Sequence, residues 1–145
     1  MQFLREYNFL LSLAFKKKKH LELVLGNQTN VEFYGCSSRI IDSAELVEKM
    51  LLDAASLINL TVVNTTIHHF SPIGVSGVIV IEESHIAVHT WPEYDYVAID
   101  FFTCNQTYEI AKAIDFLFNK LEATAKEVVH LKRGSITSIN KYKTK

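Results

Sequence analysis

The feature that most constrains the fold is a series of strand-forming residues in the middle of the chain. Residues 61–70 are rich in Thr, Val and Ile, whose β-branched side chains favour strands. A turn is predicted next, because Pro72 fixes its own φ angle and Gly74 tolerates a positive one. Residues 77–82 and 84–90 together then predict one long extended segment. A chain with this much extended structure at its centre is expected to build its core around a sheet.

Helices and further strands are predicted on both sides of this centre. After Asp42, apolar residues recur at helical spacing, and Asp42 is placed to cap that helix while Glu45 reaches back. A second amphipathic helix is predicted over residues 107–122. The other predicted strands are 20–26 and 30–35, joined by a turn at 26–29, and then 96–102 and 128–131.

The order of these elements predicts an α+β fold. We expect a two-layer sandwich, in which a mostly antiparallel sheet carries the two main helices on one face. The chain has 145 residues, long enough to bury a core, and no repeat or change in composition indicates a second domain. Residues 20–145 are therefore expected to form one domain, preceded by an N-terminal arm at residues 1–19.

Charge and cysteine content narrow the functional classes. The net charge of −1 favours neither nucleic acid nor an anionic membrane as a partner. The two cysteines, Cys36 and Cys104, are too few for a disulfide framework and indicate free thiols in a reducing compartment. The apolar segment at residues 9–15 is too short to span a membrane, and its charges follow it rather than precede it as in a signal peptide. A cytoplasmic protein is expected.

The reactive side chains are concentrated in residues 82–93. This segment contains one Ser, two His and three Glu between two apolar runs, more polar groups than a core strand needs. A metal site is disfavoured, because His85 and His89 lie roughly 13 Å apart along an ideal strand. Two ligands of one zinc ion must lie much closer together.

Nucleophilic chemistry is another interpretation of this segment, although composition alone favours ordinary structural roles for its residues. Ser84, His89 and Cys104 supply a hydroxyl, a base and a thiol. The alternative is that Ser84 is an ordinary strand residue, His89 an edge residue and Cys104 a small buried apolar group. Residues five apart on an ideal strand face opposite sides, so a bend or a neighbouring strand would have to bring Ser84 and His89 together.

Aromatic side chains flank the same segment. Phe70, Trp91, Tyr94 and Tyr96 lie just before it, within it or just after it. Such rings can stack on a base or face a cation, although most aromatic residues near a strand end belong to the core.

These residues together resemble a known family. The motif E-S-H-x-x-x-H-T-W-P-E at residues 83–93, followed by F-T-C at 102–104, is similar to the short prokaryotic S-adenosylmethionine decarboxylase proenzymes. The resemblance covers roughly residues 20–134 in the family's order and spacing. Its other matching pieces are Y-G-C at 34–36, H-F-S-P at 69–72, G-V-S-G-V at 74–78 and L-K-R-G at 131–134.

The resemblance implies a self-processing, pyruvoyl-dependent carboxy-lyase of polyamine biosynthesis. Ser84 would attack the carbonyl of Glu83 in an N-to-O acyl shift, and elimination and hydrolysis would leave a pyruvoyl group at the new N-terminus. In the family, the residues matching His89 and Ser76 assist processing, and the one matching Cys104 donates a proton during catalysis. The pyruvoyl carbonyl would bind the substrate as a Schiff base and act as an electron sink. Neither a metal nor pyridoxal phosphate is expected as cofactor.

The implied substrate is S-adenosylmethionine, whose decarboxylated form serves spermidine synthesis. By positional match, the Phe70 ring could stack on the adenine, Trp91 could add a second ring, and Glu93 could accept hydrogen bonds from the ribose hydroxyls. The family's assembly implies a homodimer of processed protomers with active sites near the interface. Small sheets with one uncovered face often need such a partner.

Two positions depart from the family pattern and leave alternatives open. Asp95 and Asn105 stand where the family usually has glycine. The Asp95 carboxylate could pair with a basic substrate, or it could be a solvated turn residue. One alternative function is therefore a pyruvoyl-dependent ornithine or arginine decarboxylase on the same scaffold. Another is an unprocessed, non-catalytic binding or regulatory homologue.

Overall fold

A computed structural model describes residues 23–104 and 109–143 of the chain. The expected N-terminal arm and Asn105 lie outside these residues. The chain divides into two compact units, one of which is Leu25–Arg133. The described part of the other comprises residues 23–24 and 134–143 and contains the helix α5 (Ile136–Tyr142), which the sequence patterns did not predict.

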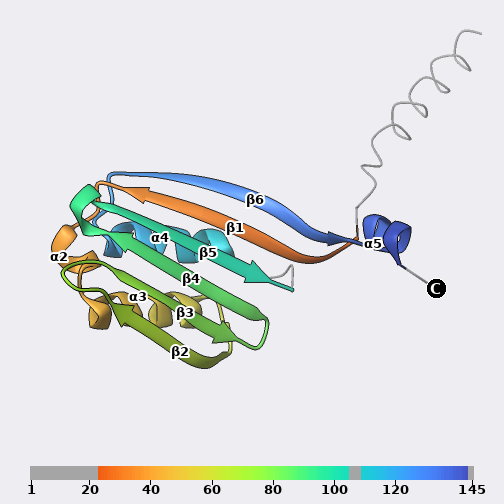
Figure 1. Cartoon of the computed structure of the whole chain (residues 1–145), viewed down its shortest axis with the longest axis horizontal. Coiled ribbons are helices and arrows are strands. Elements are labelled where there is room, and N and C mark those ends of the chain that lie inside the picture. Colours follow the sequence, from red (N-terminus) through yellow and green to blue (C-terminus); the bar gives the residue numbers. More distant parts are fainter. Residues whose placement is uncertain (1–22, 105–108, 144–145) are drawn as a thin grey trace, which may run out of the picture. The chain divides into compact units, whose positions relative to one another are not determined.

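The described residues form a six-stranded antiparallel sheet (Figure 1). Its strands lie in the order β2-β3-β4-β5-β1-β6, so the two central strands, β4 and β5, are flanked on both sides. The strands are β1 (Val24–Tyr34), β2 (Val62–His69), β3 (Val75–Ile81), β4 (Ser84–Trp91), β5 (Tyr96–Thr103) and β6 (Ala125–Ser135).

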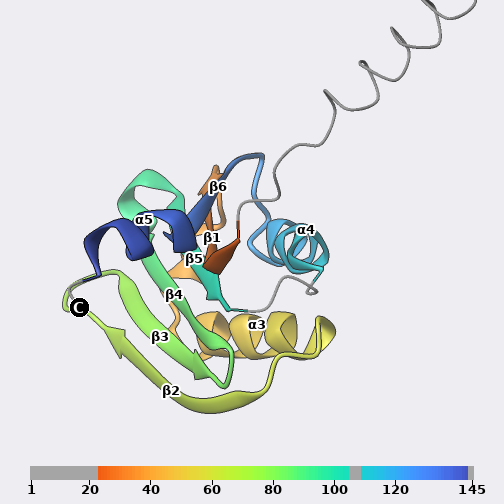
Figure 2. The ribbon, with the colours of Figure 1, turned by 90° about the vertical axis from the view of Figure 1, so that its right-hand side faces the viewer.

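Two helices, α3 (Ala44–Leu57) and α4 (Ile110–Lys120), cover one face of this sheet. Figure 2 shows both on the same side of the strands. A short helix, α2 (Ser38–Ile41), precedes α3, and a 3₁₀ helix, η1 (Pro92–Tyr94), joins β4 to β5. The predicted α+β fold, with two main helices on one face, is confirmed.

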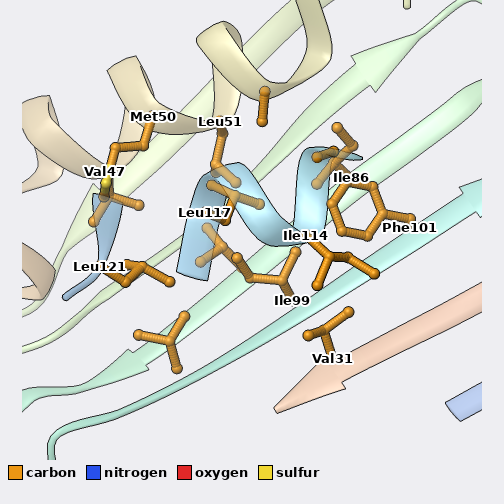
Figure 3. Close-up of a cluster of buried hydrophobic side chains, with 14 of the residues drawn as sticks. Val31, Val47, Met50, Leu51, Ile86, Ile99, Phe101, Ile114, Leu117 and Leu121 are labelled. Atoms are coloured by element: carbon orange, nitrogen blue, oxygen red, sulfur yellow. The ribbon is translucent and has the colours of Figure 1, made fainter. Parts of the chain in front are cut away.

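The core lies between the sheet and these two helices, and Figure 3 shows part of it. Burial alternates along the central strands, so that Ile86 and Val88 of β4 and Ile99 and Phe101 of β5 point toward the helices. The residues between them lie on the other face of the sheet. Since successive side chains of a strand point in opposite directions, the chain has one face for its core and another free for chemistry.

The structure corrects the prediction of two strands and a turn before residue 35. Residues 26–29 lie inside the single strand β1. Gly26 is needed there for a close approach and not for a turn, since a Cβ atom on it would lie 2.9 Å from the Phe102 ring.

The predicted long extended segment after residue 77 is also wrong. The chain reverses at Glu82 and Glu83, and β3 and β4 form a hairpin in which Ile81 pairs with Ser84. Tight hairpins favour Asn-Gly or Asp-Gly, whose residues accept positive φ angles. Glu82-Glu83 lacks that signature, so the sequence pattern did not predict the turn.

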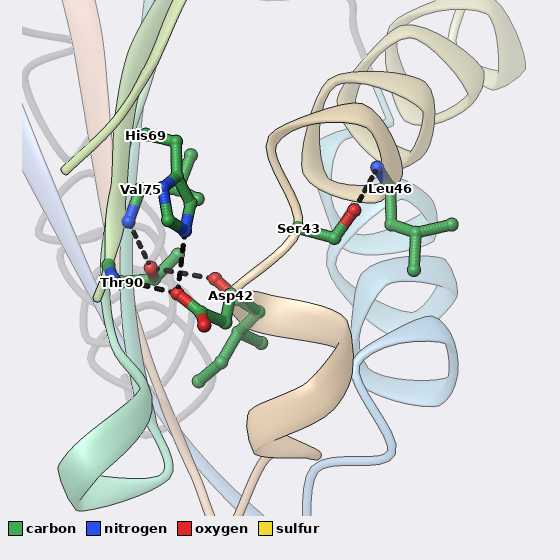
Figure 4. Close-up of polar contacts among 8 residues, drawn as sticks. Asp42, Ser43, Leu46, His69, Val75 and Thr90 are labelled. Carbon is green, nitrogen blue, oxygen red and sulfur yellow. Dashed lines mark hydrogen bonds and ion pairs between the residues drawn. The ribbon is translucent and has the colours of Figure 1, made fainter. Parts of the chain in front are cut away.

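Capping of α3 differs from the expectation by one residue. The N-cap is Ser43, whose hydroxyl accepts a hydrogen bond from the Leu46 N–H at 3.3 Å (Figure 4). Asp42 instead ends α2 and accepts the Gly74 N–H at 2.9 Å, and His69 Nε2 lies 2.9 Å from the same oxygen. The Gly74 hydrogen bond, followed by the contact with His69, lowers the pKa of the Asp42 carboxyl.

A buried threonine connects the sheet to α2. The Thr90 hydroxyl accepts the Val75 N–H and donates to the Ile41 carbonyl, both at 2.8 Å. All three residues are buried, so neither backbone group has water as a substitute partner. Thr90 therefore fixes the end of β4 against both β3 and α2.

We predict that Thr90→Val lowers the free energy of unfolding by about 1–3 kcal/mol, because it leaves two buried backbone groups without a partner while keeping the side-chain shape. Urea unfolding followed by circular dichroism measures this change. Thr66→Val is the matched control, since Thr66 is exposed on β2. Equal stability of both variants would contradict the role given to Thr90.

Candidate active site

The hairpin turn between β3 and β4 brings together residues that lie far apart in the sequence. The Glu83 carbonyl accepts a hydrogen bond from the Cys104 N–H at 3.1 Å. Ser84 pairs with Ile81 on one side and with Thr103 on the other. The peptide bond between Glu83 and Ser84 therefore lies against the end of β5.

Ser84 has an unusual backbone conformation. Its φ angle is +148°, in a region that residues with a side chain rarely adopt. Such conformations cost on the order of 1–3 kcal/mol and persist only where the surrounding structure imposes them. Ser84 is held in this conformation by its pairing with a strand on each side. The two turn residues before it, Glu82 and Glu83, have no positive φ angle, so the positive φ falls on Ser84. The Ser84 hydroxyl lies 3.3 Å from Nδ1 of His85.

Cys104 is exposed and lies directly after β5. The alternative interpretation of Cys104 as a small buried apolar group is therefore wrong. Cys36 is the buried thiol, and both cysteines are free, as predicted. Burial, with a smaller effect of the Asp95 charge, raises the pKa of the Cys36 thiol to about 11. A thiol that stays protonated and buried is a poor nucleophile, so of the two only Cys104 is available for chemistry.

A second group of candidate residues lies at the other end of the same hairpin. Ser76 and His89 are cross-strand partners, and the Ser76 hydroxyl lies 2.8 Å from His89 Nδ1. A cavity of about 320 Å³ adjoins them and is lined by Ser76 together with Phe70, Trp91 and Glu93. The structure thus places all three predicted substrate-binding residues around one cavity.

The structure does not bring His89 to Ser84 within one chain. They are five positions apart along β4, which corresponds to roughly 16 Å. By the alternation of the strand, Ser84 also belongs to the face of β4 that carries the buried residues, whereas His89 is exposed on the opposite face. The bend that would join the two is absent from β4. Within one chain, Ser84 and Cys104 therefore lie in one group, and Ser76 and His89 lie in another.

The turn beside the 320 Å³ cavity is fixed by its own contacts. The Phe70 N–H donates to the Gly74 carbonyl at 2.7 Å, and the Gly74 N–H donates to Asp42. Gly74 has a φ of +103°, and a Cβ atom on it would lie 3.2 Å from the Thr90 carbonyl. These contacts hold the half-exposed Phe70 ring at the mouth of the cavity.

Comparison with known proteins identifies the family. The family model described as S-adenosylmethionine decarboxylase matches residues 27–134. The chain belongs to this family. It is 44% identical over 115 residues to the S-adenosylmethionine decarboxylase proenzyme of Thermosipho melanesiensis, covering 79% of this chain and 88% of the relative. The Acidithiobacillus ferrooxidans proenzyme is 40% identical over 112 residues, covering 77% and 84%.

A solved structure supports the assignment. The adenosylmethionine decarboxylase of Aquifex aeolicus superposes with a TM-score of 0.71 at 30% identity, covering 77% of this chain and 92% of that one. Pyruvoyl dependence is a property of this decarboxylase family.

The backbone at Asp95 has a conformation that glycine adopts more easily than other residues. Asp95 caps η1 with φ 49° and ψ 38°, a left-handed conformation that glycine adopts freely and aspartate tolerates better than most residues. Its carbonyl accepts the Cys36 N–H at 2.8 Å. Asp95 is exposed and does not line the 320 Å³ cavity. It thus behaves as a turn residue.

Sequence reasoning missed a second cavity, of about 560 Å³, on the face away from the helices. Its lining comes from β1, η1, β5 and β6, so no local pattern could predict it. Tyr96 lies between this cavity and the 320 Å³ cavity, because the centroid of its ring is 5.3 Å from that of Trp91, which lines the 320 Å³ cavity. Burial, followed by the hydrogen bond to Glu32, raises the pKa of Tyr96. The lining residues are Glu32, Tyr34, Tyr94, Tyr96 and Glu127.

Two other sequence expectations can be compared with the described residues. Within them, no group of three or more His, Cys, Asp or Glu side chains is arranged to hold a metal ion. The same residues contain no helix that is long and apolar enough to cross a membrane.

Proposed function

We propose that the protein is an S-adenosylmethionine decarboxylase that activates itself by cleaving its chain between Glu83 and Ser84. The observation that carries this proposal is the hydrogen bond from the Cys104 N–H to the Glu83 carbonyl, beside a strained Ser84. Membership of the decarboxylase family supplies the reaction. The proposed product is decarboxylated S-adenosylmethionine, for spermidine synthesis.

Self-cleavage begins when the Ser84 hydroxyl attacks the Glu83 carbonyl carbon. Negative charge then develops on the carbonyl oxygen, where the Cys104 N–H already donates a hydrogen bond. A donor placed in advance at a developing oxyanion lowers the barrier, because it does not have to reorganise. Breaking the peptide bond also releases the conformational strain at Ser84. The amide is thereby converted to an ester between Glu83 and the Ser84 oxygen.

The pyruvoyl group forms in the steps that follow. Loss of the Cα proton of residue 84 expels the Glu83 carboxylate and leaves a dehydroalanine. Water then replaces the nitrogen of that residue, which leaves as ammonia, and a pyruvoyl carbonyl remains at the new N-terminus. Ser84 fits this origin, because it lies at the start of β4 directly after the turn, where the chain can be cut without breaking a strand.

In the decarboxylation itself, the pyruvoyl group supplies an electron sink for the electrons left by carbon dioxide. The Cys104 thiol, exposed beside residue 84, donates the proton that replaces the carboxyl group. Phe70 and Trp91 stack against the adenosyl part of the substrate, and Glu93 accepts hydrogen bonds from the ribose hydroxyls. These three residues already surround one cavity of suitable polarity.

We also propose that a complete site needs two copies of the chain. Roles for His89 and Ser76 in processing require them close to Ser84, yet they lie roughly 16 Å away along β4. A second copy can close this gap if its Ser76–His89 end meets the Ser84–Cys104 end of the first. The exposed position of His89 and Trp91, on the face that α3 and α4 leave open, supports this arrangement.

We favour S-adenosylmethionine over ornithine or arginine as the substrate. That alternative depended on the Asp95 carboxylate, which lies outside the cavity lined by Phe70, Trp91 and Glu93. We therefore expect purified protein to release label from carboxyl-labelled S-adenosylmethionine and not from labelled ornithine or arginine. Asp95→Gly should leave this preference unchanged. Release of label from an amino acid alone would overturn the proposed substrate.

Intact mass spectrometry tests self-cleavage. We expect wild-type protein to give two fragments divided between residues 83 and 84, with the second starting at a pyruvoyl group. Ser84→Ala should give one mass, that of the whole chain, because it lacks the attacking hydroxyl. A stable full-length mass for the wild type would instead support the unprocessed, non-catalytic homologue.

Mixed dimers test the two-copy site. Neither His89→Ala nor Ser84→Ala is expected to be cleaved when expressed alone. When the two are co-expressed, Ser84 of one chain meets His89 of the other, so the His89→Ala chain should be cleaved. Tags of different mass identify the cleaved chain. If Ser84 and His89 act within one chain, no cleavage is recovered, and the two-copy site is wrong.

A further inference from the structure

His85 is a base within hydrogen-bonding distance of the Ser84 hydroxyl, and the family resemblance implies no role for it. Its Nδ1 lies 3.3 Å from Ser84 Oγ, within hydrogen-bonding distance. The other histidine of β4, His89, lies at the far end of the strand and contacts Ser76. In the tautomer that leaves Nδ1 unprotonated, His85 can accept the proton of the Ser84 hydroxyl within one chain.

The orientation of the His85 ring is fixed by a neighbouring strand. His85 pairs with Phe102 across β4 and β5, and the two rings stack with centroids 5.7 Å apart and planes only 7° from parallel. The Arg133 guanidinium also lies over the Phe102 ring, 5.6 Å from its centroid, and Arg133 donates to Gln28. Residues of β5, β6 and β1 thus hold the Phe102 ring against His85.

Gly26 makes room for this stack. A Cβ atom there would lie 2.9 Å and 3.0 Å from two atoms of the Phe102 ring, so the ring would have to shift from its present position. A half-buried strand histidine with no function needs no such support. A base that must direct one nitrogen toward a hydroxyl does need it, because proton transfer depends on geometry first.

We propose that His85 is the general base that starts self-cleavage. This step rests on the proposed function. Nδ1 takes the proton from Ser84 Oγ as that oxygen bonds to the Glu83 carbonyl carbon. The Cys104 N–H stabilises the resulting oxyanion. The carbon–nitrogen bond to Ser84 then breaks, and the imidazolium returns its proton to the departing nitrogen. No external reactant is consumed, and the products are the ester and a free amine.

His85 and the His89–Ser76 pair then act on different protons. The first proton leaves the oxygen of residue 84 and the later one leaves its Cα, so the two steps need bases in different positions. His85 touches the oxygen. A variant of His85 should therefore stop the reaction before the ester forms.

The experiment follows cleavage of newly translated chains over time. We expect His85→Asn to slow cleavage by about 100-fold or more, the usual contribution of general-base catalysis. Asparagine keeps a polar group near the position of Nδ1 and cannot carry the proton. Since the reaction stops at the amide, the accumulated precursor should also resist cleavage by hydroxylamine, which attacks esters. His130→Asn is the matched control, because His130 contacts Thr29 on β1 and lies on β6, a strand that is not a neighbour of β4 in the sheet.

Chemical rescue distinguishes a base from a structural residue. Added imidazole should restore cleavage of His85→Gly, because a free base can enter the space left by the ring. A His85→Gly chain that folds and shows no rescue, or His85→Asn cleaved at the wild-type rate, would overturn the role of His85 while leaving self-cleavage intact. Failure of the wild type to cleave would instead overturn the proposed function itself.

Discussion

The hydrogen bond from the Cys104 N–H to the Glu83 carbonyl is the contact on which the site depends. It joins a hairpin turn to the end of a strand that is not part of that hairpin, so three strand ends meet at one peptide bond. In the proposed mechanism, the same bond places a thiol beside the new N-terminus and a donor at the oxyanion. One backbone contact would thereby prepare both the self-cleavage and the later proton transfer.

The alternation of the strands explains how a small domain can hold this chemistry. Ile86, Val88 and Thr90 of β4 fill or brace the core, while His85 and His89 between them lie on the opposite face. Stability and reactivity are therefore carried by different residues of one strand. Thr90 connects the two roles. Its buried hydroxyl fixes the end of β4, and the exposed residues Trp91 and Glu93 that follow it line the 320 Å³ cavity.

The fold class and much of the site could be predicted from the sequence because their signals are local. Helical spacing, β-branched runs and the motif around Ser84 all lie within short windows. The hairpin could not be predicted, since Glu82 and Glu83 lack the residues that mark tight turns. Gly26 was taken for a turn signal, although it is required by the Phe102 ring from another strand. The support of His85 was missed for the same reason, because its partners come from β5 and β6.

One cause explains both why the turn at Glu82 and Glu83 was not predicted and why Ser84 is strained. A two-residue hairpin matches the twist of its strands when its own residues adopt positive φ angles. Neither Glu82 nor Glu83 does so, and the positive φ appears one residue later, at Ser84. Replacing the turn by Asn-Gly would relax the hairpin and move the strain away from the bond that must break. A turn that is poor for folding would thus suit the proposed cleavage at that point, because strain lost on cleavage does not have to be maintained in the processed chain.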